Sequence, residues 1–188
     1  MKNRFPNRVF RAFVAGLLLA ALLGAGPAFS DSPSAIPGKR QLDADGRMRV
    51  SEGDRCPVCA MEVIRYPKFA SAIALTDGRT FYFCGTGCMI RTWLHPEVFL
   101  GVSREALDRP FVRDYFTGRA VDARRVTWVA GSDVVGAMGP AVVPIADESH
   151  VETFQRRHGG DRTFRLDEMD DARWIEITGK PAVPKKQP

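Results

Sequence analysis

The longest apolar run of the chain lies close to its start, where residues 12–23 carry no polar or charged side chain. A basic stretch precedes this run, and small residues, glycine and proline follow it. Twelve residues are fewer than the roughly 18 that a membrane-spanning helix needs, so the pattern favours a secretory signal peptide over a membrane anchor. We therefore expect residues 1–30 to be a signal peptide, cleaved near Ser30/Asp31, and the mature protein to be exported in soluble form without a stable membrane anchor.

Alternating apolar and polar positions predict strands in the first half of the mature chain. Residues 69–76 and 79–84 flank Asp77-Gly78, which is a strong signal for a β-hairpin. Residues 88–94 predict a helix that ends before a proline, and residues 97–110 predict a loop or a short helical turn. Two further strands are expected; they cover residues 111–117 and 124–130.

The hydrophobic pattern of the second half predicts the same plan. Residues 141–145 predict a strand, which Pro144 places at the edge of a sheet. Residues 148–158 predict a helix with Asp147 as its N-cap, and two more strands are expected at 163–166 and 174–178. Both halves thus predict a ββαβ-like unit, and the fold class is α+β with one compact domain.

These patterns give an expected division of the chain. A signal peptide is followed by a flexible arm, two units and a disordered tail that is rich in proline and lysine. The expected bounds are 1–30, 31–55, 56–130, 131–179 and 180–188.

Net charge changes the picture little. The whole chain has a formal charge of +5, but residues 1–30 hold four basic side chains and no acidic one. The remaining residues hold 23 basic and 22 acidic side chains, so they are almost neutral. An electrostatic argument for binding nucleic acid therefore fails.

Sulfur-bearing side chains gather in the first unit. The cysteines form a CxxC pair and, after the predicted hairpin, a CxxxC pair, which the hairpin would bring together. Soft thiolate and thioether ligands select Cu(I), Zn(II) or iron–sulfur sites over hard cations, and thioethers favour Cu(I). The cluster consists of Cys56, Cys59, Met61, Cys84, Cys88 and Met89.

Three other interpretations of the four cysteines stay open at this point. They could form two structural disulfides, as is common in exported proteins, although a CxxC disulfide closes a very small ring. The CxxC pair could be a redox dithiol that acts on other proteins, although such a motif normally opens a helix after a strand. The four thiols could also hold a structural zinc ion. No phosphate-binding loop, Ser-His-Asp set or paired-carboxylate arrangement is present, so an enzyme is not expected.

The order of motifs resembles the NosL family from about residue 56 to about residue 170. The resemblance is carried first by Cys56-Pro-Val-Cys59-Ala-Met61, Tyr66-Pro67-Lys68, Asp77-Gly78 and Phe81-Tyr82-Phe83. It continues through Asp122-Ala123-Arg124, Trp128-Val129, Gly131-Ser132-Asp133-Val134, Met138-Gly139, Pro144, the residues from Phe154 to Gly160, and Arg165-Leu166-Asp167-Glu168.

This resemblance implies a function that composition cannot give. It implies a periplasmic Cu(I) metallochaperone, not an enzyme, that delivers copper for the maturation of nitrous oxide reductase. The implied partners are apo nitrous oxide reductase and its membrane assembly machinery. It also implies a fold of two ββαβ units related to the organomercurial lyase domain. Cu(I) is the expected metal and Zn(II) the alternative; the candidate ligands are Cys56, Cys59, Met61, Cys84, Cys88 and Met138.

The chain departs from the family pattern at three points. Many relatives carry a lipid-modified cysteine at the mature N-terminus, and this leader has none. Relatives usually have glycine where Ala60 stands and an acidic residue where Cys84 stands. The additional thiol makes the four cysteines resemble treble-clef metal-sensing motifs as well.

Overall fold

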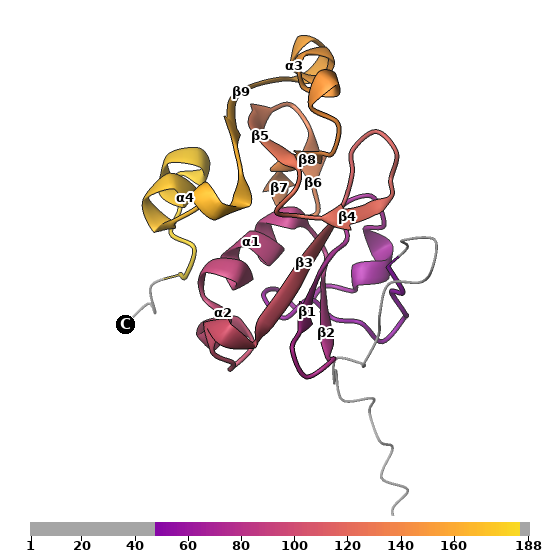
Figure 1. The fold of residues 1–188 in the computed structure, drawn as a ribbon, viewed down its shortest axis with the longest axis vertical. Helices are drawn as coiled ribbons and strands as arrows, with labels where there is room; N and C mark the ends of the chain where they lie inside the picture. The colour runs from indigo at the N-terminus through magenta and orange to yellow at the C-terminus, as the bar shows by residue number, and fades with distance from the viewer. Residues whose placement is uncertain (1–47, 185–188) are drawn as a thin grey trace, which may run out of the picture. The chain divides into compact units, whose positions relative to one another are not determined.

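The first sheet carries the predicted hairpin. The computed structural model describes residues 48–184, which all lie in one compact unit. Four antiparallel strands form this sheet in the order β2-β1-β3-β4 (Figure 1). Gly78, at φ +85°, lies in the turn between β1 and β2, so the expected hairpin is confirmed. The strands are β1 (Ser71–Leu75), β2 (Thr80–Phe83), β3 (Leu107–Arg113) and β4 (Ala120–Asp122).

Helix α1 (Thr86–Leu94) follows β2 and packs against β1, β2 and β3. It begins two residues before the expected helix, and the short α2 (Pro96–Phe99) follows it directly. Strand β3 begins before the strand expected at 111–117, because its pairing with β1 extends back through Pro110 to Leu107. Two 3₁₀ turns, η1 (Val63–Arg65) and η2 (Arg104–Ala106), precede β1 and β3.

A second antiparallel sheet has the order β8-β5-β9. Pro144 lies in the edge strand β8, as predicted. Its carbonyl oxygen accepts a hydrogen bond from Tyr115 N–H, 3.0 Å between nitrogen and oxygen. The strands are β5 (Thr127–Ser132), β8 (Val143–Ile145) and β9 (Gly159–Phe164), with a small hairpin of β6 (Val135–Gly136) and β7 (Gly139–Pro140) between β5 and β8.

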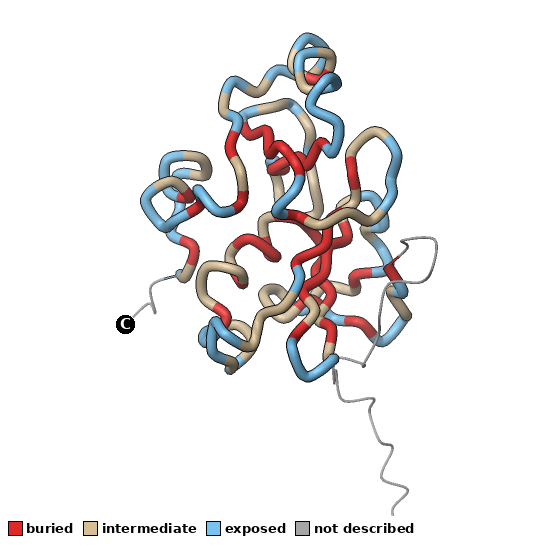
Figure 2. Tube along the Cα trace, viewed as in Figure 1, coloured by how far each residue is buried: buried red, intermediate tan, exposed pale blue. Residues whose placement is uncertain are grey.

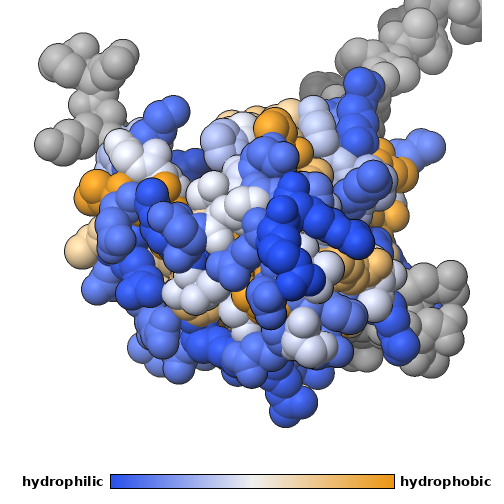
Figure 3. All heavy atoms as spheres, turned by 90° about the horizontal axis from the view of Figure 1, so that it is seen from above, coloured by the Kyte–Doolittle hydropathy of each residue, from blue (hydrophilic) through white to orange (hydrophobic). Residues whose placement is uncertain are grey.

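Helix α3 (Val151–His158) lies between β8 and β9 in the chain. The 3₁₀ turn η3 (Glu148–His150) leads into it, and the Asp147 carboxylate caps this turn by accepting a hydrogen bond from Ser149 N–H. Charged side chains cover the exposed side of α3, and the face of the molecule seen from above is mostly hydrophilic (Figure 3).

One predicted element is wrong. Residues 174–178, expected as a strand, belong to helix α4 (Asp171–Thr178), which follows the 3₁₀ turn η4 (Leu166–Glu168). The Asp170 carboxylate accepts a hydrogen bond from Arg173 N–H, and Gly179 ends the helix in the left-handed region at φ +71°. These two caps, together with burial of Trp174, favour a helix over the strand that the alternating sequence suggests.

The two sheets share a connection pattern, which agrees with the predicted α+β class. In each, the first strand is central, the second and third flank it, and a helix joins the second to the third. The second set begins with β5 at Thr127, and this strand runs across residue 130, where the sequence places the boundary between the two units. Buried residues from both halves form one core; Met89, Val112, Trp128 and Phe164 belong to it (Figure 2).

Residues near both ends of the described region pack against the rest of the unit. Met48 and Asp54, from the expected arm, are buried. Ala182, from the expected tail, is also buried, and its carbonyl oxygen accepts a hydrogen bond from Arg91. The predicted signal peptide lies outside the described residues. Within 48–184, no helix has the length and apolar character needed to span a bilayer.

Candidate metal centre

The four cysteines of the sequence meet at one point. Their sulfur atoms all lie within 4.8 Å of one another. The Sγ atoms of Cys59 and Cys84 are 3.3 Å apart, and those of Cys84 and Cys88 are 3.9 Å apart. None of the four is bonded to another in this structure. We call this group the thiol cluster.

A short loop at 54–63 presents Cys56 and Cys59. Cys56 N–H donates to the Met61 carbonyl, and Val63 N–H donates to the Asp54 carbonyl, both at 3.0 Å. Ala60 N–H in turn donates to the Cys56 carbonyl at 2.8 Å. These bonds close a tight loop that turns both cysteine side chains toward the same side.

Ala60 has φ +60°, in the left-handed region that normally favours glycine. Glycine, which the family resemblance leads one to expect at this place, adopts this conformation without the steric cost that a Cβ atom brings.

The second pair comes from the junction of β2 and α1. Cys84 directly follows β2, and Cys88 lies in the first turn of α1. Two hydroxyls fix this junction: Ser71 Oγ donates to the Gly85 carbonyl at 3.2 Å, and Thr86 Oγ1 donates to the Val142 carbonyl at 2.6 Å. Both hydroxyl residues are buried. Sequence reasoning missed them, because no local pattern marks a serine or threonine that bonds to a carbonyl far along the chain.

Hydrogen bonds shift the pKa values of the thiols in opposite directions. The thiols of Cys84 and Cys88, together with the backbone N–H groups of Cys84 and Val58, donate to the Cys56 sulfur and hold the pKa of Cys56 far below its usual range. The same bonds raise the pKa of Cys84 and of Cys88, because ionising either one removes a donor and places a second charge beside Cys56. Burial raises both pKa values further. The direction of these shifts makes Cys56 the most acidic of the three thiols.

The spacing of the sulfurs suits a single soft metal ion. A metal–sulfur bond of about 2.3 Å places two sulfurs about 3.8 Å apart around a tetrahedral ion, and about 4.6 Å apart across a linear one. The separations in the thiol cluster cover this range. Cys56, Cys84 and Cys88 are buried and Cys59 is half-buried, so Cys59 is the most solvent-accessible of the four.

The methionines are not equivalent. Met61 is half-buried beside the loop that carries Cys56 and Cys59, and it packs against the core. Met89 is fully buried in the core. Met138, on the connection between β6 and β7, has an exposed fraction of 58%. The structure therefore brings the four cysteines together and leaves Met138 at the surface.

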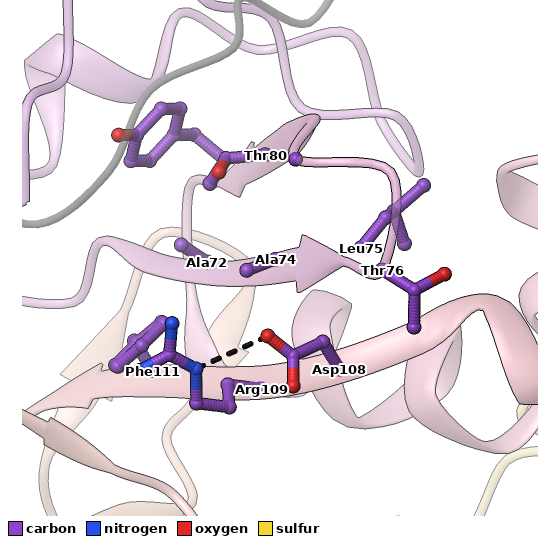
Figure 4. Close-up of a pocket in the computed structure, with 10 residues that line it drawn as sticks. Ala72, Ala74, Leu75, Thr76, Thr80, Asp108, Arg109 and Phe111 are labelled. Atoms are coloured by element: carbon purple, nitrogen blue, oxygen red, sulfur yellow. Dashed lines mark hydrogen bonds and ion pairs between the residues drawn. The ribbon is translucent and has the colours of Figure 1, made fainter.

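A cavity of about 540 Å³ has both Met138 and one cysteine of the thiol cluster in its wall. Cys88 from α1, Met138 and Trp174 from α4 are among the residues that line it. A smaller cavity of about 310 Å³ lies over β1, β2 and β3 and has Thr80, Asp108 and Arg109 in its wall (Figure 4). No candidate ligand lines this smaller cavity. Of these two cavities, only the larger one is lined by a residue of the metal centre.

Fold and site together define an α+β protein with a largely buried cluster of four thiols that fits a soft metal ion. The NosL family model matches residues 47–174. The chain therefore belongs to the NosL family.

Two relatives show how far the similarity extends. The chain is 28% identical over 166 residues to the copper-binding lipoprotein NosL of Stutzerimonas stutzeri, an alignment that covers 84% of this chain and 81% of that protein. Its fold is similar to the crystal structure of the copper chaperone NosL from Shewanella denitrificans, with a TM-score of 0.59 and 21% identity. That match covers 68% of this chain and 98% of the other.

Proposed function

We propose that this chain is a copper chaperone that carries Cu(I) in the thiol cluster. The observation that supports the proposal most directly is the cluster itself: four sulfur atoms within 4.8 Å, in a chain of the NosL family. Thiolates favour Cu(I) over harder cations, and the lowered pKa of Cys56 favours its thiolate form. The relative from Stutzerimonas stutzeri, a copper-binding lipoprotein by name, supports the same metal.

The chemistry is ligand exchange, so no covalent bond of a substrate is made or broken. Cys59 and Cys88, one from each segment, hold the ion, with Cys56, Cys84 and Met61 as further donors. A partner replaces these sulfurs one at a time, so the ion never becomes free. This role needs no catalytic residues, and we propose a carrier that is not an enzyme.

Copper exchange with a partner occurs through the cavity beside Cys88. Met138 is exposed and lines that cavity together with Cys88, which places a thioether on the path between solvent and cluster. A neutral thioether binds Cu(I) more weakly than a thiolate does, which suits a donor that must release the ion. Met138 is thus proposed as a transient ligand.

The recipient of the copper and the cellular location are proposed from membership of the NosL family. Nitrous oxide reductase in its apo form, with its membrane assembly machinery, is the proposed recipient, and the periplasm is the proposed place of transfer. The expected signal peptide and the lipoprotein nature of the Stutzerimonas relative both support an exported protein.

The first test is a set of ligand substitutions under anaerobic, reducing conditions. Cys59→Ser and Cys88→Ser should each abolish stoichiometric Cu(I) binding, whereas Met61→Leu should only weaken it, because a thiolate is a charged donor and a thioether is neutral. Competition with a chromophoric Cu(I) chelator measures the affinity. Met169→Leu, at a buried methionine outside the sulfur motifs, is the matched control and should bind as the unchanged chain does. Tight binding of one Cu(I) by both serine variants would show that the ligands are misassigned.

A structural zinc site is the second candidate, and the closed geometry of four thiols favours it. Metal analysis of protein purified anaerobically separates the two. One Cu(I) per chain that a chelator exchanges supports the chaperone. Zinc that resists exchange, and whose removal unfolds the chain, supports the structural site.

A further inference from the structure

The thiol cluster has more sulfur than a transported Cu(I) ion needs. Two or three sulfurs satisfy a low-coordinate Cu(I) ion, and the cluster offers four thiols and, beside them, the thioether of Met61. The sulfur atoms of all four thiols lie within 4.8 Å of one another. Two thiols are also what is needed to supply two electrons, by forming one disulfide.

The four thiols are not alike in access or spacing. Cys59 is half-buried, and its sulfur lies 3.3 Å from that of Cys84, a shorter separation than the 3.9 Å between Cys84 and Cys88. Cys56 and Cys88 have exposed fractions of 1% and 3%. A hydrated ion that approaches from solvent therefore meets Cys59 first, and the neighbour in contact with Cys59 is Cys84.

We propose that the cluster reduces Cu(II) as it captures copper, with Cys59 and Cys84 as the electron donors. Each of these thiols loses one proton and one electron, and a bond forms between the two sulfurs. Two Cu(II) ions each accept one electron and become Cu(I). The products of one turn are one disulfide, two Cu(I) ions and two protons, so atoms and electrons balance. One Cu(I) stays weakly held by Cys56 and Cys88, and the other passes to an acceptor thiol or chelator.

Geometry favours a bond within the chain. A disulfide is about 2.05 Å long, so the two sulfurs must approach by about 1.3 Å from their present separation. Cys59 lies next to the exposed Ala60 in a loop, whereas Cys84 is fixed at the end of β2, so Cys59 is the partner that moves. A sulfur radical formed on Cys59 is already in contact with the sulfur of Cys84. Bond formation within the chain is therefore faster than reaction with a second chain.

The inference rests on the proposed function, because it uses the same cluster and the same metal. It adds that the chain accepts copper in either oxidation state. Oxidation also leaves a defined pair of thiols, Cys56 and Cys88, whose sulfurs lie within 4.8 Å of each other. Without Cys59 this pair holds Cu(I) only weakly, so a dithiol reductant must reduce the disulfide back to two thiols before stoichiometric binding or a second turn.

The experiment mixes the reduced mature chain, without oxygen, with two equivalents of copper(II) sulfate and the Cu(I) indicator bicinchoninate. We expect Cu(I) to form within the first minutes, two of the four thiols to disappear, the chain to stay monomeric, and peptide mapping to join Cys59 to Cys84. Unreduced Cu(II), a disulfide between chains, or a different pair would overturn the proposal.

Variants test the assignment of the pair. Cys59→Ser and Cys84→Ser should each slow Cu(II) reduction at least tenfold, and Met169→Leu should not slow it. Since Cys84→Ser removes a buried side chain and could impair folding, alkylation of the half-buried Cys59 in the native reduced chain provides a second measurement. Alkylation of one thiol per chain, with circular dichroism unchanged, should also abolish the fast reduction. Fast reduction after this alkylation would refute the role of Cys59.

Direct addition of Cu(I) distinguishes this inference from the proposed function. A chain that binds Cu(I) and leaves Cu(II) unreduced overturns the inference alone. A chain that reduces Cu(II) and retains no Cu(I) overturns the proposed function and leaves the redox activity standing.

Discussion

At the scale of single residues, the metal centre depends on one strained position. Ala60 adopts φ +60° because the loop must turn back for its N–H to reach the Cys56 carbonyl. A Cβ atom in this region costs roughly 1 kcal/mol relative to glycine. The chain therefore keeps a small strain in the loop that presents two of its four thiols.

Ala60→Gly should relieve this strain and raise the free energy of unfolding by about 1 kcal/mol. Urea denaturation of the reduced, metal-free chain measures the effect. The matched control is Ala74→Gly in the extended strand β1, which should lower the free energy of unfolding by roughly 0.5–1 kcal/mol. A loss of stability in Ala60→Gly would contradict the loop conformation.

Cys84→Asp tests the residue at which this chain departs from the family pattern. If Cys84 is a ligand, the variant should still bind Cu(I), with lower affinity and fewer sulfur neighbours, because a carboxylate is a harder donor. X-ray absorption of the loaded proteins counts the sulfurs, and circular dichroism checks that the buried carboxylate leaves the fold intact. An equal sulfur count in both proteins would show that Cys84 never binds the metal.

At the scale of elements, helix α4 shows where the sequence is ambiguous. Its residues alternate apolar and polar side chains near the C-terminal half, as a strand does, yet the caps at Asp170 and Gly179 close it as a helix. Asp170→Ala should therefore lower the free energy of unfolding by about 1 kcal/mol. Asp167→Ala, at an exposed residue just before the helix, should change it by less than about 0.5 kcal/mol. Thermal denaturation compares the two, and equal effects would argue against the cap.

Local signals decided which elements could be predicted. The hairpin at Asp77-Gly78 and the edge position of Pro144 follow from backbone constraints of one or two residues, so the sequence alone predicts them. The start of β3 and the helical state of α4 depend on pairing and burial against distant residues. The meeting of the four cysteines was predictable from the hairpin, whereas the Thr86 bond to Val142 required the fold.

At the scale of the whole molecule, the thiol cluster joins segments that the chain separates. The 54–63 loop supplies one pair of thiols, and the β2–α1 junction supplies the other. The second sheet contributes through the Thr86 bond to Val142, which lies just before β8, and through the shared core. A metal ion bound to all four sulfurs would thus connect the loop to the helix that both sheets support.

Cu(I) loading should for this reason stabilise the whole unit. A ligand that binds only the folded chain stabilises it by about 2.7 kcal/mol when its free concentration is a hundred times Kd. The thermal midpoint should rise with Cu(I), and amide hydrogen exchange should slow in the 54–63 loop and at residues 84–88 together. In Cys88→Ser, the same Cu(I) concentration should give little rise in the midpoint. Slower exchange confined to the 54–63 loop of the unchanged chain would contradict a centre shared by both segments, because Cys56 and Cys59 would then hold the metal without Cys84 and Cys88.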